Sequence, residues 1–219
     1  MPLRDEQIDL YSRQIILREL GGIGQGRLLE ARCLLRGSGP AFASAATYLA
    51  GAGIGRLDLA TSTELPPLGF APLEERNPDC RLAEFEPSTP RDDYDVLIET
   101  PGCDATGKFF PDTAGTARCG EIVIEGDSQA IRLHVVPATE GCLDCLMEPP
   151  PGSGAGPTTE MAMAGTMAAL TALRWLTTKP GTIRAQTQQL DVSGSPPTWM
   201  STSLRRMPVC PRPCRTTVA

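Results

Sequence analysis

The chain has 219 residues, with 26 Asp and Glu against 20 Lys and Arg, which gives a formal charge of −6 and a pI near 4.9. The basic residues form no stripe, so the chain lacks the positive surface that nucleic-acid binding requires, and the single histidine, His134, excludes metal centres built on several imidazoles. Residues 1–18 hold no continuous apolar stretch, and no segment reaches the roughly 18 apolar residues of a membrane helix. We therefore expect a cytoplasmic protein with no signal peptide and no membrane contact.

The first part of the chain predicts helices followed by a strand–helix–strand unit. Apolar residues recur at helical spacing over residues 5–20, and a second short helix is predicted at 26–31. A buried strand is predicted at 33–35, a helix of small residues at 41–52, and a second strand at 56–60. This order is typical of a βαβ unit, which implies parallel strands.

The second part of the chain continues the sheet. Strands are predicted at residues 81–85, 94–99, 121–125 and 131–136, then a helix at 161–176 and a hairpin of strands at 183–192 and 198–206. Residues 148–159 are rich in Pro and Gly without periodicity, which predicts a mobile surface loop. His134, in a strand of period-two pattern, is expected to face outward rather than to act in catalysis. We expect one domain over residues 1–219, an α/β, doubly wound, Rossmann-like, mostly parallel sheet with a C-terminal antiparallel extension.

The eight cysteines are expected to be metal ligands or buried thiols, because a reducing compartment disfavours disulfides. Cys142 and Cys145 form a C-x-x-C pair, and Cys210 and Cys214 form a C-x-x-x-C pair. Two such pairs can supply four thiolates to one tetrahedral zinc ion, which is structural because no position is left for water. Two unrelated thiol pairs, or a redox-active C-x-x-C, are the alternatives; no helix start follows Cys142 to support the redox role. The other cysteines lack a partner at short spacing: Cys33, expected in the core, and Cys80, Cys103 and Cys119, which stay unassigned.

The turn after the first strand, Gly37-Ser38-Gly39, lies where a dinucleotide- or ATP-binding loop is found. Phe42 stands at the third glycine position of G-x-G-x-x-G, and Pro40 removes an amide hydrogen that could face phosphate. Gly37 and Gly39 are therefore interpreted as a vestigial nucleotide loop, and a turn that binds nothing is the alternative. No acidic residue ends the second strand, which runs from Ala60 into Thr61.

A series of short motifs follows the chain in order. They are Tyr11-Ser12-Arg13-Gln14, residues 24–28, 31–35 and 50–55, Asn77-Pro78-Asp79, residues 93–98, residues 141–146 with Pro149-Pro150, and residues 208–211. Together these motifs resemble the ThiF/MoeB/HesA family of adenylyltransferases, which are related to the ubiquitin-activating enzymes. The resemblance implies a dimer that binds ATP and magnesium and adenylates the C-terminal glycine of a small ubiquitin-like or sulfur-carrier protein.

Compared with that family, most of the ATP and magnesium ligands are missing. The resemblance places the two acidic residues after the second strand at Thr61 and Thr63, and the aspartate after the fourth strand near Gly102. The shortened segment 62–76 lacks the Asn, Gln, Arg and Lys ligands of the family, and residues 149–159 hold no cysteine for a thioester. Arg13 is kept: it matches the arginine that reaches the ATP of the other subunit, with a solvated helix arginine as the alternative.

These observations favour a degenerate family member that pairs with itself or with an active paralogue and binds a ubiquitin-like or sulfur-carrier protein. Zinc is its expected structural cofactor, whereas ATP and magnesium are in doubt and enzymatic activity is left open. One alternative is an active adenylyltransferase with rearranged ligands, such as Asp58, Glu64 or Asp104 for magnesium. Another is a non-catalytic, peptide-binding scaffold in a modification pathway.

Overall fold

The computed structural model describes residues 2–61, 77–86, 88–90, 93–101, 119–127, 129–137, 139–141, 158–179 and 181–205. The strands are β1 (Arg32–Arg36), β2 (Arg56–Ala60), β3 (Arg81–Glu84), β4 (Val96–Glu99), β5 (Gly120–Gly126), β6 (Ala130–Val136), β7 (Gln186–Asp191) and β8 (Thr198–Ser203). The helices are α1 (Asp5–Leu10), α2 (Ser12–Ile15), α3 (Gly21–Glu30), α4 (Gly39–Ala52) and α7 (Thr158–Thr177).

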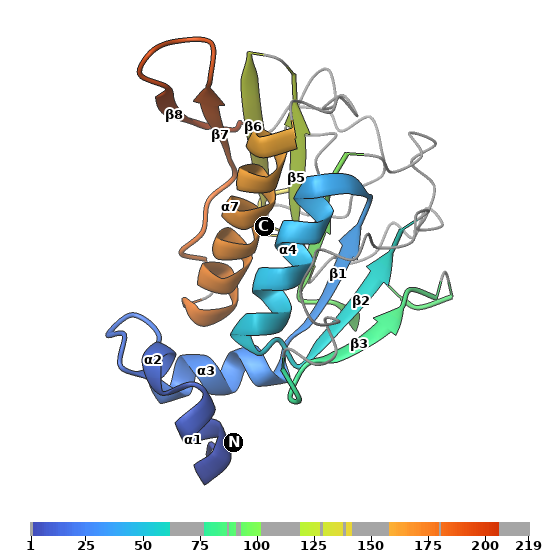
Figure 1. Ribbon diagram of the computed structural model, residues 1–219, viewed down its shortest axis with the longest axis vertical. Coiled ribbons are helices and arrows are strands. Elements are labelled where there is room, and N and C mark those ends of the chain that lie inside the picture. Colours follow the sequence, from blue (N-terminus) through green and yellow to red (C-terminus); the bar gives the residue numbers. More distant parts are fainter. Residues whose placement is uncertain are drawn as a thin grey trace.

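The described strands form one eight-stranded sheet in the order β3-β2-β1-β4-β5-β6-β7-β8 (Figure 1). The strands from β3 to β5 are parallel, and those from β5 to β8 are antiparallel. The sheet is therefore Rossmann-like in its first half and extended by antiparallel strands in its second half, as the sequence predicts.

The main hydrophobic core lies between the sheet and the helices α4 and α7, which run side by side over one face (Figure 1). The two helices approach closely because their contact is made of small residues: a Cβ on Gly165 would lie 2.0 Å from the carbonyl oxygen of Ala41. Cys33 is fully buried in this core, which confirms its predicted place. A smaller cluster on the opposite face contains Leu34, Phe85, Tyr94, Leu97 and Cys119.

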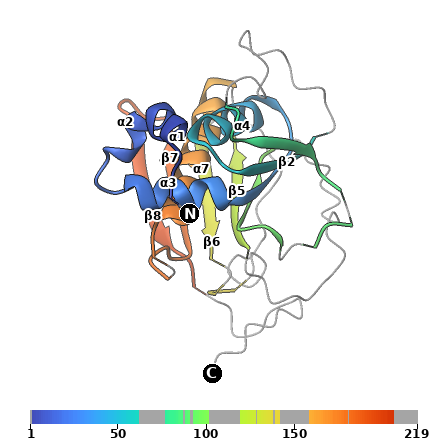
Figure 2. The same cartoon turned by 90° about the horizontal axis from the view of Figure 1, so that it is seen from below.

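The single helix predicted for residues 5–20 is wrong. The backbone leaves the helix at Tyr11, with φ −97° and ψ 13°, so that α1 and α2 are separate and α3 begins at Gly21. Tyr11 is buried, and its hydroxyl reaches Asn77 Oδ1 at 2.9 Å and Asp79 Oδ2 at 3.1 Å. Figure 1 shows α1, α2 and α3 gathered at one end of the molecule, the end that faces the viewer in Figure 2.

The helix α7 begins earlier than the sequence predicts. Thr158 and Thr159, predicted as the end of a mobile loop, belong to the first turn of α7, and the rest of that loop lies outside the described residues. Among the described residues, no helix has both the length and the apolar character needed to cross a bilayer.

Candidate functional site

The order of the parallel strands reverses at β1, which has β2 on one side and β4 on the other. In sheets of this kind, ligands bind outside the carboxyl ends of the strands at the point of reversal. Here these ends are Arg36 of β1, Ala60 of β2 and Glu99 of β4, together with the turn that leads into α4. This edge is the candidate site.

The turn after β1 uses its backbone amides internally. The N–H of Gly37 donates to the carbonyl oxygen of Ala60 at 2.9 Å, and the N–H of Ser38 donates to that of Pro101 at 3.1 Å. A phosphate-binding loop needs amides that point at the ligand. Since both amides are bonded to strand ends, this turn lacks two of the donors that a phosphate would use.

Glycine at position 37 is explained by packing rather than by a ligand. Gly37 has φ +119°, and a Cβ there would lie 2.2 Å from Thr100 Oγ1. The same hydroxyl donates to the carbonyl oxygen of Arg36 at 3.0 Å, which ties the ends of β1 and β4 together. Phe42 is buried in the main core, so the third glycine position of the fingerprint has become a packing position.

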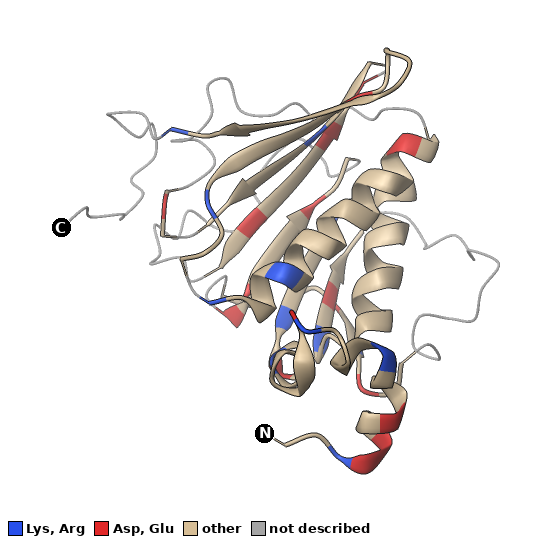
Figure 3. Ribbon diagram, turned by 90° about the vertical axis from the view of Figure 1, so that its left-hand side faces the viewer, with Lys and Arg blue, Asp and Glu red and all other residues tan. Residues whose placement is uncertain are grey.

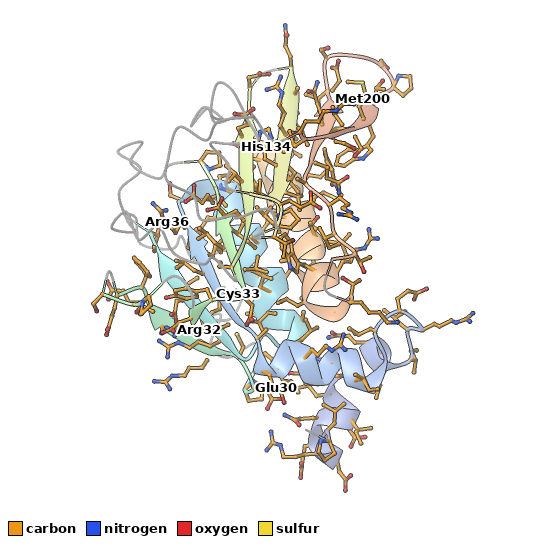
Figure 4. The ribbon with its side chains drawn as sticks, turned by 180° about the vertical axis from the view of Figure 1, so that it is seen from behind. Glu30, Arg32, Cys33, Arg36, His134 and Met200 are labelled. Atoms are coloured by element: carbon orange, nitrogen blue, oxygen red, sulfur yellow. The ribbon has the colours of Figure 1, made fainter. Side chains whose placement is uncertain are left out.

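Arg36 and Glu99 form an ion pair at the carboxyl edge, with Nη1 and Oε1 2.5 Å apart. The Arg36 side chain is only 6% exposed and that of Glu99 is 31% exposed. Figure 4 shows Arg32 and Arg36 at opposite ends of β1. No sequence motif predicted this pair. The signal that could have found it is a charged residue that ends an apolar strand directly before the glycine turn.

Asp58, a possible magnesium ligand in one sequence-based alternative, has another role. Its carboxylate is buried and accepts hydrogen bonds from Arg32 at 2.6 Å, Arg56 at 2.7 Å and the Tyr94 hydroxyl at 2.7 Å. Burial would raise the pKa of Asp58, but the hydrogen bonds from Arg56, Arg32 and Tyr94 outweigh it, so the pKa is lowered. Asp58 therefore holds β1, β2 and the segment before β4 together and has no oxygen free of protein donors.

The remaining acidic and cysteine positions lie partly inside and partly outside the described residues. Thr61 is exposed at the end of β2, in place of a carboxylate. Within the described ranges, His, Cys, Asp and Glu form no group of three that could hold a metal ion. Cys80 and Cys119 are buried thiols, and burial raises the pKa of Cys80 to about 11. Positions that lie outside the described residues are Thr63, Glu64, Gly102, Cys103, Asp104 and the predicted zinc ligands Cys142, Cys145, Cys210 and Cys214.

Arg13 lies on α2 and is exposed. Within the described part of the chain it makes no hydrogen bond or ion pair. The neighbouring Tyr11 is fixed to Asn77 and Asp79, so α2 starts from a fixed point while the guanidinium of Arg13 stays available to a second molecule.

The expectation that His134 faces solvent is wrong, since its side chain is 1% exposed. Its strand lies between β5 and β7, and both neighbours contribute contacts: His134 Nδ1 is 2.9 Å from Thr187 Oγ1, and Nε2 is 3.3 Å from Glu125 Oε1. The period-two pattern gave the face of the strand correctly but not the burial of that face.

Comparison with curated proteins gives clear relatives. No protein-family model matches the chain. The vegetative HesA protein of Trichormus variabilis is 33% identical over 202 residues, which cover 78% of this chain and 76% of HesA. A uba4 protein of Aspergillus terreus, named an adenylyltransferase and sulfurtransferase, is 27% identical over 250 residues and covers 93% of this chain. The alignment covers 51% of uba4, so the chain spans about half the length of that relative.

Solved structures match the fold at low sequence identity. The crystal structure of E. coli MccB with MccA-N7isoASN has a TM-score of 0.70 at 16% identity and covers 94% of this chain and 74% of MccB. The structure of MccB with ATP has a TM-score of 0.67 at 15% identity, covering 88% and 68%. PaaA has a TM-score of 0.64 at 14% identity, covering 94% and 76%. With HesA 33% identical over most of both chains, the protein belongs to the ThiF/MoeB/HesA family of adenylyltransferase-like proteins.

Proposed function

We propose that this chain is a non-catalytic member of its family, which pairs with itself or with an active paralogue and binds a ubiquitin-like or sulfur-carrier protein. The observation that carries the proposal is the state of the carboxyl edge. The amides of Gly37 and Ser38 donate to the carbonyl oxygens of Ala60 and Pro101, and the buried Arg36 pairs with Glu99 beside them. Among the described residues of this region, the ligands that ATP and magnesium would need are missing, because Thr61 stands where the family resemblance expects a carboxylate and Asp58 is fully used by protein donors.

The direct test of inactivity is ATP–pyrophosphate exchange by the purified chain with a carrier protein that ends in Gly-Gly. We expect no exchange above background, because adenylation needs cations and amides to offset charge on the triphosphate. An active family member assayed with the same carrier is the positive control. Robust exchange by this chain would contradict the proposal and favour rearranged ligands.

In the proposed pair with an active paralogue, Arg13 would reach the ATP bound by that paralogue. The Arg13 side chain is exposed and makes no ion pair within the described residues. In a complex with an active paralogue, Arg13→Ala should lower the exchange rate of the paralogue at least about tenfold, since one lost charge contact to a transition state has effects of this size or larger. Arg18→Ala is the matched control, because Arg18 is another exposed arginine between α2 and α3. Equal effects of the two substitutions would count against a specific role for Arg13.

We also propose a structural zinc ion held by Cys142, Cys145, Cys210 and Cys214. Four thiolates are a donor set that suits zinc, and such a set leaves no position for a reacting water. Metal analysis of the purified chain should find one zinc ion per molecule. Cys142→Ser and Cys210→Ser should each abolish that content and lower thermal stability, whereas Cys103→Ser should keep it. A zinc content that survives Cys210→Ser would disprove the four-cysteine site.

Support for a protein partner comes from the molecules and activities named for similar proteins. MccB, which shares the fold, has been solved with MccA, and uba4 is named an adenylyltransferase and sulfurtransferase. Co-purification of the chain with a small protein that ends in Gly-Gly would support carrier binding. Capture of short peptides alone would instead favour the scaffold alternative.

A further inference from the structure

The outer strand of the sheet, β8, is open to pairing. It ends the strand order of the described sheet, and all six of its residues are exposed. An edge strand presents alternating N–H and C=O groups on its free side, and a second extended strand is the structure that satisfies such a row.

β8 carries none of the usual features that prevent such pairing. Its sequence, Thr-Trp-Met-Ser-Thr-Ser, contains no charged residue and no proline (Figure 3). Its register with β7 runs without a bulge from Gln186 opposite Ser203 to Asp191 opposite Thr198. Natural proteins protect exposed edges with lysine, proline, bulges or very short strands. The edge is therefore a template for a ninth strand.

The surface of the hairpin suits an uncharged, partly apolar strand. In the chain as a whole 21% of residues are charged, whereas between Ala185 and Leu204 the single charged residue is Asp191. Trp199 and Met200 are 45% and 48% exposed and, as neighbours in a strand, point to opposite faces. Trp199 continues a row of cross-strand neighbours, Ile131 and Leu190, and borders an apolar groove against Met163 of α7. An added strand would lengthen this apolar row.

The two ends of the hairpin carry opposite charges. Arg205 lies at one end, where Leu204 N–H is bonded to the carbonyl oxygen of Ala185, and the nearby Arg184 is already paired with Glu140 at 2.9 Å. Asp191 lies at the other end, opposite Ala130 and Thr198, and the nearby Asp127 is already paired with Arg132 at 3.3 Å. In antiparallel pairing of two identical edges, the arginine end of one copy lies along the aspartate end of the other. The edge is thus complementary to itself in backbone, in polarity and in charge.

We propose that β8 pairs antiparallel with β8 of a second copy of this chain, so that one sheet runs through a two-fold dimer. This interface is distinct from α2, which lies at the far end of the molecule (Figure 1). Six residues of edge bury less than the roughly 1,200 Å² of the smallest stable interfaces, so the dimer is weak and forms in the micromolar range or above. Met200, in the middle of the strand, lies near the two-fold axis.

Sedimentation equilibrium of the intact chain over a wide concentration range tests the proposal. We expect a reversible association that doubles the mass of the smallest species, and Met200→Lys should raise its dissociation constant about tenfold or more, because lysine is the residue that natural edges use against pairing. Leu170→Lys is the matched control, since Leu170 is 49% exposed but lies on α7, off the edge and outside the groove beside Trp199. Its dissociation constant should stay within about twofold of the parent value, and the circular dichroism of both variants should be unchanged.

The opposite charges at the two ends of the hairpin allow a second, independent test. Arg205→Glu should weaken the dimer, and adding Asp191→Lys should restore it, because the double change inverts both ends and recreates the complementarity. A chain whose mass does not rise with concentration would overturn the proposal, as would a rise in mass that Met200→Lys leaves intact. A monomer that binds a strand of different sequence at β8 would assign the edge to another protein and would also overturn it. Arg13→Ala should leave this equilibrium unchanged, so its outcome is separate from that of the proposed function.

Discussion

At the residue scale, the turn between β1 and α4 shows why a glycine fingerprint can outlast the ligand. Gly37 is held by Thr100, whose hydroxyl and backbone fill the space that a Cβ would need. Gly39 also has a positive φ, +74°, but a Cβ there would meet nothing within 4 Å. The two glycines therefore differ in what they do, although they look alike in the sequence.

This difference predicts unequal costs of substitution. Gly37→Ala combines an unfavourable φ with a clash against Thr100 and should destabilise the fold by about 3 kcal/mol or more. Gly39→Ala should destabilise it by about 1 kcal/mol, the cost of a left-handed conformation alone. Chemical denaturation of both variants gives the comparison. Equal losses would show that the contact with Thr100 does not explain Gly37.

Asp58 gives a pH-dependent prediction at the same scale. Its pKa is lowered in the folded state, so its ionised form stabilises the fold above the ordinary aspartate pKa of about 3.9 and this stabilisation is lost as the pH falls through the folded-state value. Asp58→Asn should lower the free energy of unfolding by about 3 kcal/mol at neutral pH, because it removes one partner of a buried ion pair.

The difference between Asp58→Asn and the parent chain should shrink as the pH is lowered below about 4. Asp93→Asn is the control, since Asp93 lies 3.6 Å from the same Arg32 but is half exposed, and its effect should stay below about 1 kcal/mol. A pH-independent effect of Asp58→Asn would show that packing, not charge, is what the residue contributes.

At the element scale, the N-terminal helices are fastened at one point. Tyr11 bonds to Asn77 and Asp79, and Arg4 and Gln7 of the same region also reach Asp79, at 2.8 and 3.0 Å. Burial, with the neighbouring Asp79 charge, raises the pKa of Tyr11 to about 12, so its hydroxyl keeps its proton across the physiological range. By contrast, four apolar residues of this region are exposed: Ile8, Leu10, Ile16 and Leu17. The N-terminal helices therefore bury little of their own apolar surface.

Tyr11→Phe should therefore loosen α1 and α2 before it affects the sheet. We expect a loss of about 1 kcal/mol from the missing hydrogen bonds and faster amide hydrogen exchange confined to the N-terminal helices. Tyr48→Phe, on the exposed face of α4, should change neither quantity. Uniformly faster exchange throughout the sheet would contradict a local anchoring role.

The elements that were predicted well are those with a local signal. The strand Arg56–Ala60 has the bounds that were predicted from its sequence, and the small residues of α4 and α7 indicated their packing correctly. Contacts distant in sequence were not predictable. Tyr11 breaks its helix for partners 66 and 68 residues away, and Arg36 meets Glu99 across 63 residues. The candidate site is made of such contacts, so the sequence indicated where it departs from the family pattern but not which contacts the departing residues make.

At the scale of the whole molecule, the proposed loss of nucleotide binding should make stability independent of nucleotide. A ligand present at a hundred times its dissociation constant would add about 2.7 kcal/mol to the free energy of unfolding. Thermal unfolding of this chain in millimolar MgATP should therefore match unfolding without it. An active family member should show a clear rise under the same conditions. A rise of several degrees for this chain would show that the edge still binds ATP.

Gly53, the left-handed residue that ends α4, lies directly under the ring of Tyr11: a Cβ there would meet the hydroxyl oxygen at 2.5 Å. The other end of α4 begins at Gly39, in the turn at the carboxyl edge. A helix of 14 residues is a stiff rod roughly 20 Å long. Tyr11 and the turn at the carboxyl edge therefore lie at opposite ends of one and the same helix.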